Sequence, residues 1–217
     1  MVDLTAPHNV TLYVAGLQKK PSTHSIGAPS HLLGARLLPM AALKLLGPQL
    51  AQAPAGWTPL ATFLGQDAGK LAQQLAATRN TPQSIAVLTD FLRPRLLSPS
   101  QPSQLDAALN LCLTCQGQLT VTALAHHAAS TERSLRRAFG SQLGMSPKHF
   151  LRIIRFQAAL QHGPSHTNHA LLASHYGYAD QSHLSREIKI LSGDTPSTLL
   201  SRPGAPELAK AIAARHR

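Results

Sequence analysis

The sequence predicts a mostly α-helical protein, with about seven helices in a C-terminal half that contains one helical unit twice, preceded by a small α+β domain. Three observations support this class. The chain has 217 residues and is 43% hydrophobic, which is enough for one or two domains with a real core. Helix-capping residues and glycine or proline stops follow one another from residue 104 onward. A pattern of leucine, arginine, glycine and proline also recurs there at a constant offset.

The two copies of this pattern lie 49 residues apart. The first copy contains Leu135-x-Arg137-x-Phe139 and Gly144-x-Ser146-Pro147, and the second contains Leu184-x-Arg186-x-Ile188 and Gly193-x-Thr195-Pro196. Thr131 and Asp180, which are expected to cap a helix in each copy, keep the same offset. A Leu-Ala pair precedes each copy, at 124–125 and 172–173. A small residue lets two short helices pack at a steep angle, so the sequence predicts two helix-turn-helix units in tandem.

A polar stretch that proline interrupts twice, residues 98–103, is the expected linker between two domains. An N-terminal domain then spans 1–97, the two helical units lie within 104–202, and a tail follows at 203–217. In the N-terminal domain, residues 9–17 alternate like a strand, with Val10, Leu12 and Val14 on one side. Residues 34–39 predict a second strand, and helices are expected at 40–46 and 69–77.

A longer helix of this domain is expected to begin at Thr81-Pro82, because threonine caps a helix and proline fits its first turn. Pro94 is expected to end it, because the residue before a proline disfavours the helical conformation. Its inward-facing positions are predicted to be Ile85, Leu88 and Leu92.

After the linker the sequence is almost continuously helical. The expected helices cover 104–116, 121–127, 131–143, 147–160, 170–176, 180–193 and a last one from Thr195-Pro196. Ala129 occupies the turn position where glycine often permits a left-handed backbone, so the first turn is expected to be slightly strained or shaped differently. The second turn contains Gly177 and is one residue longer.

Basic residues outnumber acidic ones by 20 to 9, and most of the excess is C-terminal. Positions 120–217 hold twelve basic and five acidic residues, against eight and four in 1–119. Residues 131–163 hold six basic residues and one acid. Such an excess attracts a polyanion, although charge alone is equally well explained by a solvated face. The duplicated unit is what favours double-stranded DNA as the partner.

The second helix of each unit is expected to bury one stripe and to expose a polar face. Leu135, Ala138 and Phe139 face inward in the first unit, and Leu184 and Ile188 in the second. The candidate DNA-binding residues are Arg133, Ser134, Arg136 and Arg137 in the first unit, Gln181, Ser182, His183, Ser185 and Arg186 in the second, and Arg152 between them. Arginine can pair in bidentate fashion with guanine and glutamine with adenine, while Arg152 would contact phosphate. For Arg137 and Arg186, bracing their own unit through a local carboxylate stays open as the alternative.

These residues resemble the DNA-binding domain of the AraC/XylS family of bacterial transcriptional regulators. The likeness covers roughly 103–202 and is carried by Leu124-Ala125, Thr131–Phe139, Gly144–Phe150, Arg155–Leu160, Gly177–Arg186 and Gly193–Pro196. By resemblance, Arg133, Arg136, Gln181, Ser182 and His183 match positions that family members aim at bases, and Arg137 and Arg186 match arginines near the backbone or bases. The sequence departs from the family in lacking the turn glycine at 128–129 and in the histidines of 162–168.

The resemblance implies a sequence-specific transcription regulator that reads two successive major grooves and acts at the bacterial nucleoid, in the cytoplasm. It implies double-stranded DNA as partner, with RNA polymerase as a further one. Family members usually carry a separate effector or dimerisation domain, and residues 34–47 and 81–96 resemble the second half of such a sensor. The strand content is too small for a closed β-barrel, so we expect a truncated or reduced sensor-like domain. A homodimer through this domain and a small-molecule effector stay open.

Two other functions stay open beside this one: a non-specific architectural DNA-binding protein, and an enzyme with a histidine-based site. His162, His166 and His169 have a spacing that suits a metal, but Gly163-Pro164 breaks the helix and no Asp, Glu or Cys joins them. The sequence contains no phosphate-binding loop, nucleophile elbow or carboxylate pair. We therefore expect no catalytic residues, no metal and no cofactor.

Cys112 and Cys115 form a C-x-x-C pair without a second pair to complete a metal site. They are expected to be buried, reduced core residues, with a redox or metal role as the alternative. The N-terminus has no basic stretch followed by an apolar one, and no apolar run approaches the ~20 residues that would cross a bilayer. A cytosolic location without a membrane partner follows as the expectation.

Overall fold

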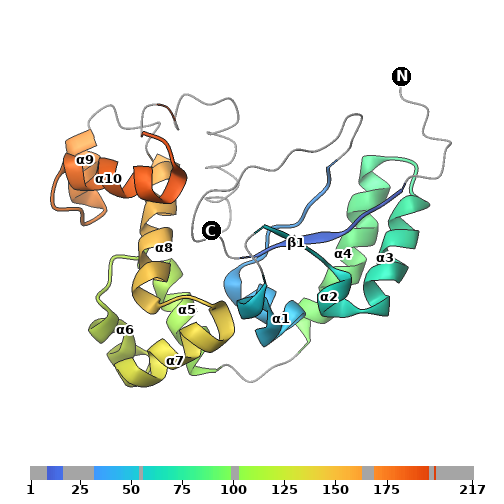
Figure 1. Cartoon of the computed structure of the whole chain (residues 1–217), viewed down its shortest axis with the longest axis horizontal. Coiled ribbons are helices and arrows are strands. Elements are labelled where there is room, and N and C mark those ends of the chain that lie inside the picture. The colour runs from blue at the N-terminus through green and yellow to red at the C-terminus, as the bar shows by residue number, and fades with distance from the viewer. Residues whose placement is uncertain are drawn as a thin grey trace. The chain divides into compact units, whose positions relative to one another are not determined.

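The structure is a computed structural model that describes residues 9–16, 32–53, 56–98, 103–162, 169–195 and 198 (Figure 1). Within this part the chain forms ten α-helices and one two-stranded sheet, which confirms the predicted, mostly helical class. Contacts divide the chain into two compact units, and most of the chain from Ser103 onward belongs to the second. The last predicted helix, from Thr195-Pro196, lies outside the described residues except for Thr195 and Thr198.

The first unit contains the sheet, four α-helices and a 3₁₀ helix. Strand β1 (Tyr13–Ala15) pairs antiparallel with β2 (Trp57–Pro59), so that Val14 lies opposite Thr58. Its helices are α1 (Pro39–Leu46), η1 (Pro48–Gln52), α2 (Ala61–Leu64), α3 (Gln66–Ala76) and α4 (Thr81–Leu97). Around β1, the side chains of residues 10, 12 and 14 are less exposed than their neighbours, as the alternation predicts.

Four predictions for this unit are wrong, of which the last concerns the end of α4. Residues 34–39 do not form a strand, because 32–38 have no regular structure and Pro39 begins α1. The partner of β1 is instead the three-residue β2, which is too short to leave an alternating pattern. Asn80, and not Thr81, caps α4, since its side chain accepts a hydrogen bond of 2.9 Å from the Gln83 backbone N–H. Ile85 is 49% exposed instead of facing inward.

Helix α4 also continues through Pro94 to Leu97, although the proline was expected to end it. Side-chain donors hold the last turn in place. The Lys44 ammonium of α1 donates to the Leu96 carbonyl at 2.8 Å, and the Arg95 guanidinium donates to the Phe91 carbonyl at 2.9 Å. Since Lys44 comes from another helix and Arg95 bonds within α4 itself, a local rule about proline does not alone decide where the helix ends.

The second unit contains six described helices: α5 (Gln104–Thr114), α6 (Val121–His127), α7 (Glu132–Leu143), α8 (Pro147–His162), α9 (His169–His175) and α10 (Gln181–Ser192). The expected caps are confirmed at three of them. The side chains of Thr120, Thr131 and Asp180 accept hydrogen bonds from the backbone N–H groups three residues later, at 3.1, 3.1 and 2.6 Å. Gly193 ends α10 in the left-handed conformation.

Helix α8 contributes to both halves of this unit, and Figure 1 shows it running from the α5–α7 group to the α9–α10 pair. Near its start, Phe150 packs edge-on against Phe139 of α7, with ring centroids 5.6 Å apart. Near its end, Ala158 and Ala159 join the core formed by α9 and α10, whose buried residues are Leu172, Ala173, Tyr176, Tyr178, Leu184 and Ile188. The same helix therefore supports both helical units.

A tight turn after α5 lies directly on the backbone of α8. Gly117 has φ +72°, and a Cβ atom there would lie 2.3 Å from the Leu151 carbonyl oxygen and 2.6 Å from the Arg155 nitrogen. The Arg155 guanidinium donates to the Gly117 carbonyl from Nε at 3.3 Å and from Nη2 at 2.9 Å. Only glycine satisfies both the backbone conformation and the close approach.

We therefore predict that Gly117→Ala lowers the free energy of unfolding by at least about 2 kcal/mol, because left-handed strain and a clash with rigid helix backbone add together. Urea unfolding of the full chain measures the effect. Gly140→Ala is the matched control, because Gly140 lies within α7 and its Cβ would meet nothing within 4 Å. That substitution should instead raise stability by about 0.5–1 kcal/mol. Equal effects would contradict the close packing at Gly117.

The two cysteines differ in burial, which leads to a second prediction. Cys112 is fully buried in α5, and burial raises the pKa of its thiol to about 12, with a smaller contribution from Cys115. At pH 8 only about one Cys112 thiol in ten thousand is then ionised. Iodoacetamide should modify half-buried Cys115 in the folded protein and Cys112 only in urea, as peptide mass spectrometry would show. Rapid modification of Cys112 in the folded protein would contradict this result.

Candidate nucleic-acid interface

Both turns between the paired helices close with the same backbone hydrogen bond. The N–H of Ser130 donates to the Ala125 carbonyl, and the N–H of Tyr178 donates to the Ala173 carbonyl, each at 2.9 Å. The residue before each donor is left-handed, with φ +48° at Ala129 and +67° at Gly177. An alanine in this conformation costs roughly 1–2 kcal/mol, so the first turn carries the strain that its sequence predicts.

Helix α7 separates its residues into an inner and an outer face, as its pattern predicts. Leu135 and Phe139 are buried. Three arginines are exposed on the other side, and Ser134 and Ala138 are half-buried. The exposed arginines are Arg133, Arg136 and Arg137. The first unit thus presents a strongly cationic helix surface.

These arginines differ in what they contact. The Glu132 carboxylate accepts a hydrogen bond from the Thr122 hydroxyl and forms an ion pair with Arg136 one turn along the helix. The Thr122 hydrogen bond, together with Arg136, holds the pKa of Glu132 below its usual value. In the part of the chain that the structure describes, the side chains of Arg133 and Arg137 make no hydrogen bond or ion pair. These two guanidinium groups are therefore available to a ligand.

Helix α10, like α7, has a buried inner face and an exposed outer face, but its outer residues are different. Leu184 and Ile188 are buried, while Gln181, Ser182 and Arg186 are exposed. His183 and Ser185 are half-buried. Arg186 donates from Nε to the Ser182 carbonyl of its own helix at 3.2 Å. The second unit therefore presents uncharged hydrogen-bonding groups together with Arg186 and the exposed Lys189 of α10.

Two of the residues predicted to contact DNA, Arg152 and His183, lie beside Glu187. This residue lies on the buried side of α10, and its carboxylate accepts a hydrogen bond of 3.1 Å from Arg152 Nε. His183 Nε2 lies 4.0 Å from the same carboxylate oxygen. Glu187 was not predicted from the sequence, although its place with Leu184, Ile188 and Leu191 on the inward stripe of α10 is a detectable signal. An acid on an apolar stripe usually has a partner of opposite charge.

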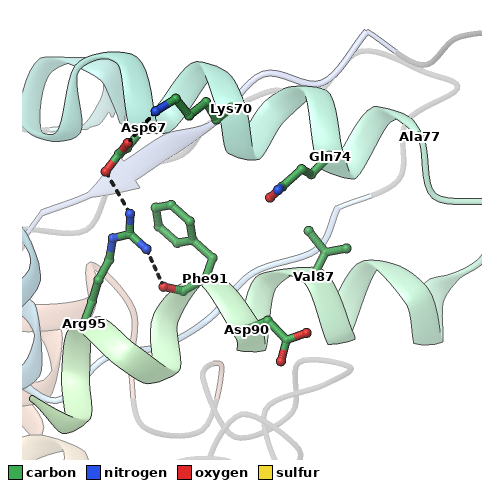
Figure 2. Close-up of a pocket in the computed structure, with 8 residues that line it drawn as sticks. All are labelled: Asp67, Lys70, Gln74, Ala77, Val87, Asp90, Phe91 and Arg95. Carbon is green, nitrogen blue, oxygen red and sulfur yellow. Dashed lines mark hydrogen bonds and ion pairs between the residues drawn. The ribbon is translucent and has the colours of Figure 1, made fainter.

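The first unit has an open groove of about 560 Å³ between α3 and α4 (Figure 2). Its charged end is an internal network, in which Asp67 pairs with Arg95 at 2.8 Å and with Lys70 at 3.6 Å. The hydrogen bond from Arg95 is the main cause that lowers the pKa of Asp67. The Arg95 guanidinium also lies 3.8 Å from the centroid of the Phe91 ring. The volume suits a small molecule, but the paired charges select no class of ligand.

The alternative sites gain no support from the described residues. Among them, no group of three or more His, Cys, Asp or Glu side chains is placed to hold a metal ion. The histidine cluster lies largely outside this part, since His166 is not described and nothing is described of the His162 and His169 side chains. No helix in the described ranges is long and apolar enough to cross a membrane.

Comparison with known proteins identifies the C-terminal units. A family model described as a helix-turn-helix domain matches residues 124–202. No curated protein and no solved structure matched the chain. The matched range begins within α6 and contains α7, α8, α9 and α10. Residues 124–202 are therefore similar to a helix-turn-helix domain, which is a DNA-binding domain of transcription regulators.

Proposed function

We propose that this protein is a sequence-specific transcription regulator that reads two successive major grooves of one DNA duplex with α7 and α10. The observation that carries the proposal is the pair Arg133 and Arg137, exposed on α7 without a partner among the described residues. A partnerless cationic pair on a helix-turn-helix surface suits the major groove, where arginine bonds to O6 and N7 of guanine.

The other candidate residues have secondary parts in this proposal. Arg136 is drawn toward Glu132, so it contacts DNA only by exchanging that partner for a base or phosphate. Gln181, Ser182, Ser185 and Arg186 would read the second groove, with Gln181 suited to adenine. The capped N-terminus of α7 favours a nearby phosphate, whereas the Asp180 carboxylate at the start of α10 opposes one.

The length of α8 agrees with a site of this size. Its 16 residues span roughly 24 Å at 1.5 Å per residue. Recognition helices that read one face of B-DNA must lie about 34 Å apart, so the loops and the helices themselves would supply the rest. A modest bend in the DNA would bring both helices into their grooves.

Further partners follow from the class of protein. A regulator of this type acts at the bacterial nucleoid in the cytoplasm, with RNA polymerase as the machinery that it influences. The first unit would serve as the sensor-like or dimerisation module, and the groove between α3 and α4 is where an effector would have room. A non-specific architectural DNA-binding protein is the alternative function, since a cationic surface alone attracts any duplex.

A salt titration distinguishes the two functions. Duplexes selected by the full chain from a random pool should bind at least about a thousandfold more tightly than random duplexes at physiological salt, because base contacts add to phosphate contacts. Fluorescence anisotropy at several salt concentrations measures both affinities. Equal affinities for selected and random duplexes at every salt concentration would support the architectural protein and contradict the proposal.

Substitution of the partnerless arginines tests the assignment to bases. Arg133→Gln or Arg137→Gln should cost about 1–3 kcal/mol on a selected duplex and relax base preference in one half of the site only. Binding of a randomised pool to each variant gives the base preference at every position. Arg93→Gln is the control, because Arg93 is exposed on α4 and its loss removes the same charge outside the interface. Equal losses on selected and random duplexes would assign the arginines to phosphate.

A further inference from the structure

Glu187 joins two helices of the second unit that the proposed function requires to keep a fixed angle. Its side chain is 9% exposed, and that of Arg152 on α8 is 31% exposed. The Arg152–Glu187 hydrogen bond of 3.1 Å is therefore shielded on the Glu187 side and partly open to water on the other. A buried carboxylate is costly without a partner, so Glu187 constrains where α8 can lie against α10.

His183 is part of the same arrangement. Its Nδ1 accepts a hydrogen bond of 3.3 Å from the Ala179 backbone N–H, so the neutral ring carries its proton on Nε2, which faces Glu187. The edge of the ring packs against Tyr178, with centroids 5.3 Å apart. Both ring nitrogens have neighbours within the protein. The main role of His183 is therefore to maintain the structure of this unit, and contact with a DNA base is secondary.

A second line of contact runs along the other end of α8. Ala158 and Ala159 pack into the core that contains Leu184 and Ile188 of α10. These alanines lie six or seven residues after Arg152, which is roughly 9–10 Å along a helix. A single contact would let α10 pivot on α8, whereas two contacts at this separation resist rotation. Because the alanine side chains are small, the Arg152–Glu187 hydrogen bond determines the angle between α8 and α10.

We propose that Glu187 is a positioning residue, which holds Arg152 and His183 and thereby fixes the spacing at which α10 reads DNA relative to α7. The inference rests on the proposed function, because spacing has meaning only if both helices read one duplex. Each added base pair moves the second half of a site by about 3.4 Å and turns it by about 34°. If α10 is held at one angle, the protein binds tightly at one distance between the two half-sites. If α10 is released, the protein binds at several such distances.

The experiment uses the full chain and duplexes with the two selected half-sites separated by the preferred spacer or by one base pair more or less. For the unsubstituted protein, we expect the preferred spacer to bind about tenfold more tightly than the other two. In Glu187→Gln, and separately in Arg152→Met, this ratio should fall by at least about threefold, and the double variant should show no further fall. Base preference in the first half should stay unchanged.

Charge and folding are controlled separately. Asp90→Asn and Arg93→Met remove the same charges from exposed positions of α4 and should change all affinities without changing the spacing ratio. Circular dichroism and thermal unfolding identify a variant that does not fold. If Glu187→Gln does not fold, Arg152→Met decides the result, because Arg152 is the partly exposed member of the pair. If the spacing ratio persists in the folded variants, the inference about Glu187 is wrong, whereas the proposed function still stands. Absence of base preference in the unsubstituted protein would overturn the proposed function, and the inference with it.

Discussion

The C-terminal unit depends on one helix that serves two hydrophobic cores. Phe150 near the start of α8 packs on Phe139 of α7, and Ala158 and Ala159 near its end complete the core of α9 and α10. Burial of these side chains is the main favourable term in folding, and it sets which faces of α7 and α10 turn outward. The exposed arginines and amides are thus a consequence of where leucine, isoleucine and phenylalanine are buried.

The few acidic residues then decide which cations remain available to DNA. With 9 acids for 20 basic residues, every ion pair removes a cation from the available set. Glu132 engages Arg136, and Glu187 engages Arg152. Exposed pairs of this kind stabilise little by themselves, so the Glu132 pair is easily exchanged for a phosphate. The shielded Glu187 pair resists exchange, so Arg152 stays with its carboxylate while Arg136 can leave Glu132 for DNA.

The sequence predicts the helical class, the capping residues Thr120, Thr131 and Asp180, and the buried stripe with Leu135 and Leu184, because these features depend on local spacing. It fails where distant residues intervene. Helix α4 passes Pro94 where Lys44, from another helix, donates to the Leu96 carbonyl, and β2 exists through its pairing with β1. For the candidate site, exposure of the arginines was predictable from periodicity. The spacing of Glu132 and Arg136, one turn apart, and the place of Glu187 on the inward stripe of α10 are also visible in the sequence. The contact of Glu187 with Arg152 was not predictable, because it depends on how α8 packs against α10.

The two proposed recognition helices are not equivalent, and this asymmetry follows from their chemistry. The outer face of α7 carries three arginines, whereas α10 exposes glutamine, serine, Lys189 and one arginine bonded to its own helix. Guanidinium groups bind phosphate as well as guanine, while neutral groups depend on the geometry of their hydrogen bonds to bases or phosphates. The first unit is therefore suited both to attachment and to guanine reading, whereas the second, with less charge, depends more on the fit of its neutral hydrogen bonds. Discrimination by weak neutral contacts requires the reading helix to be held at a fixed angle, because a small rotation misplaces every hydrogen bond at once.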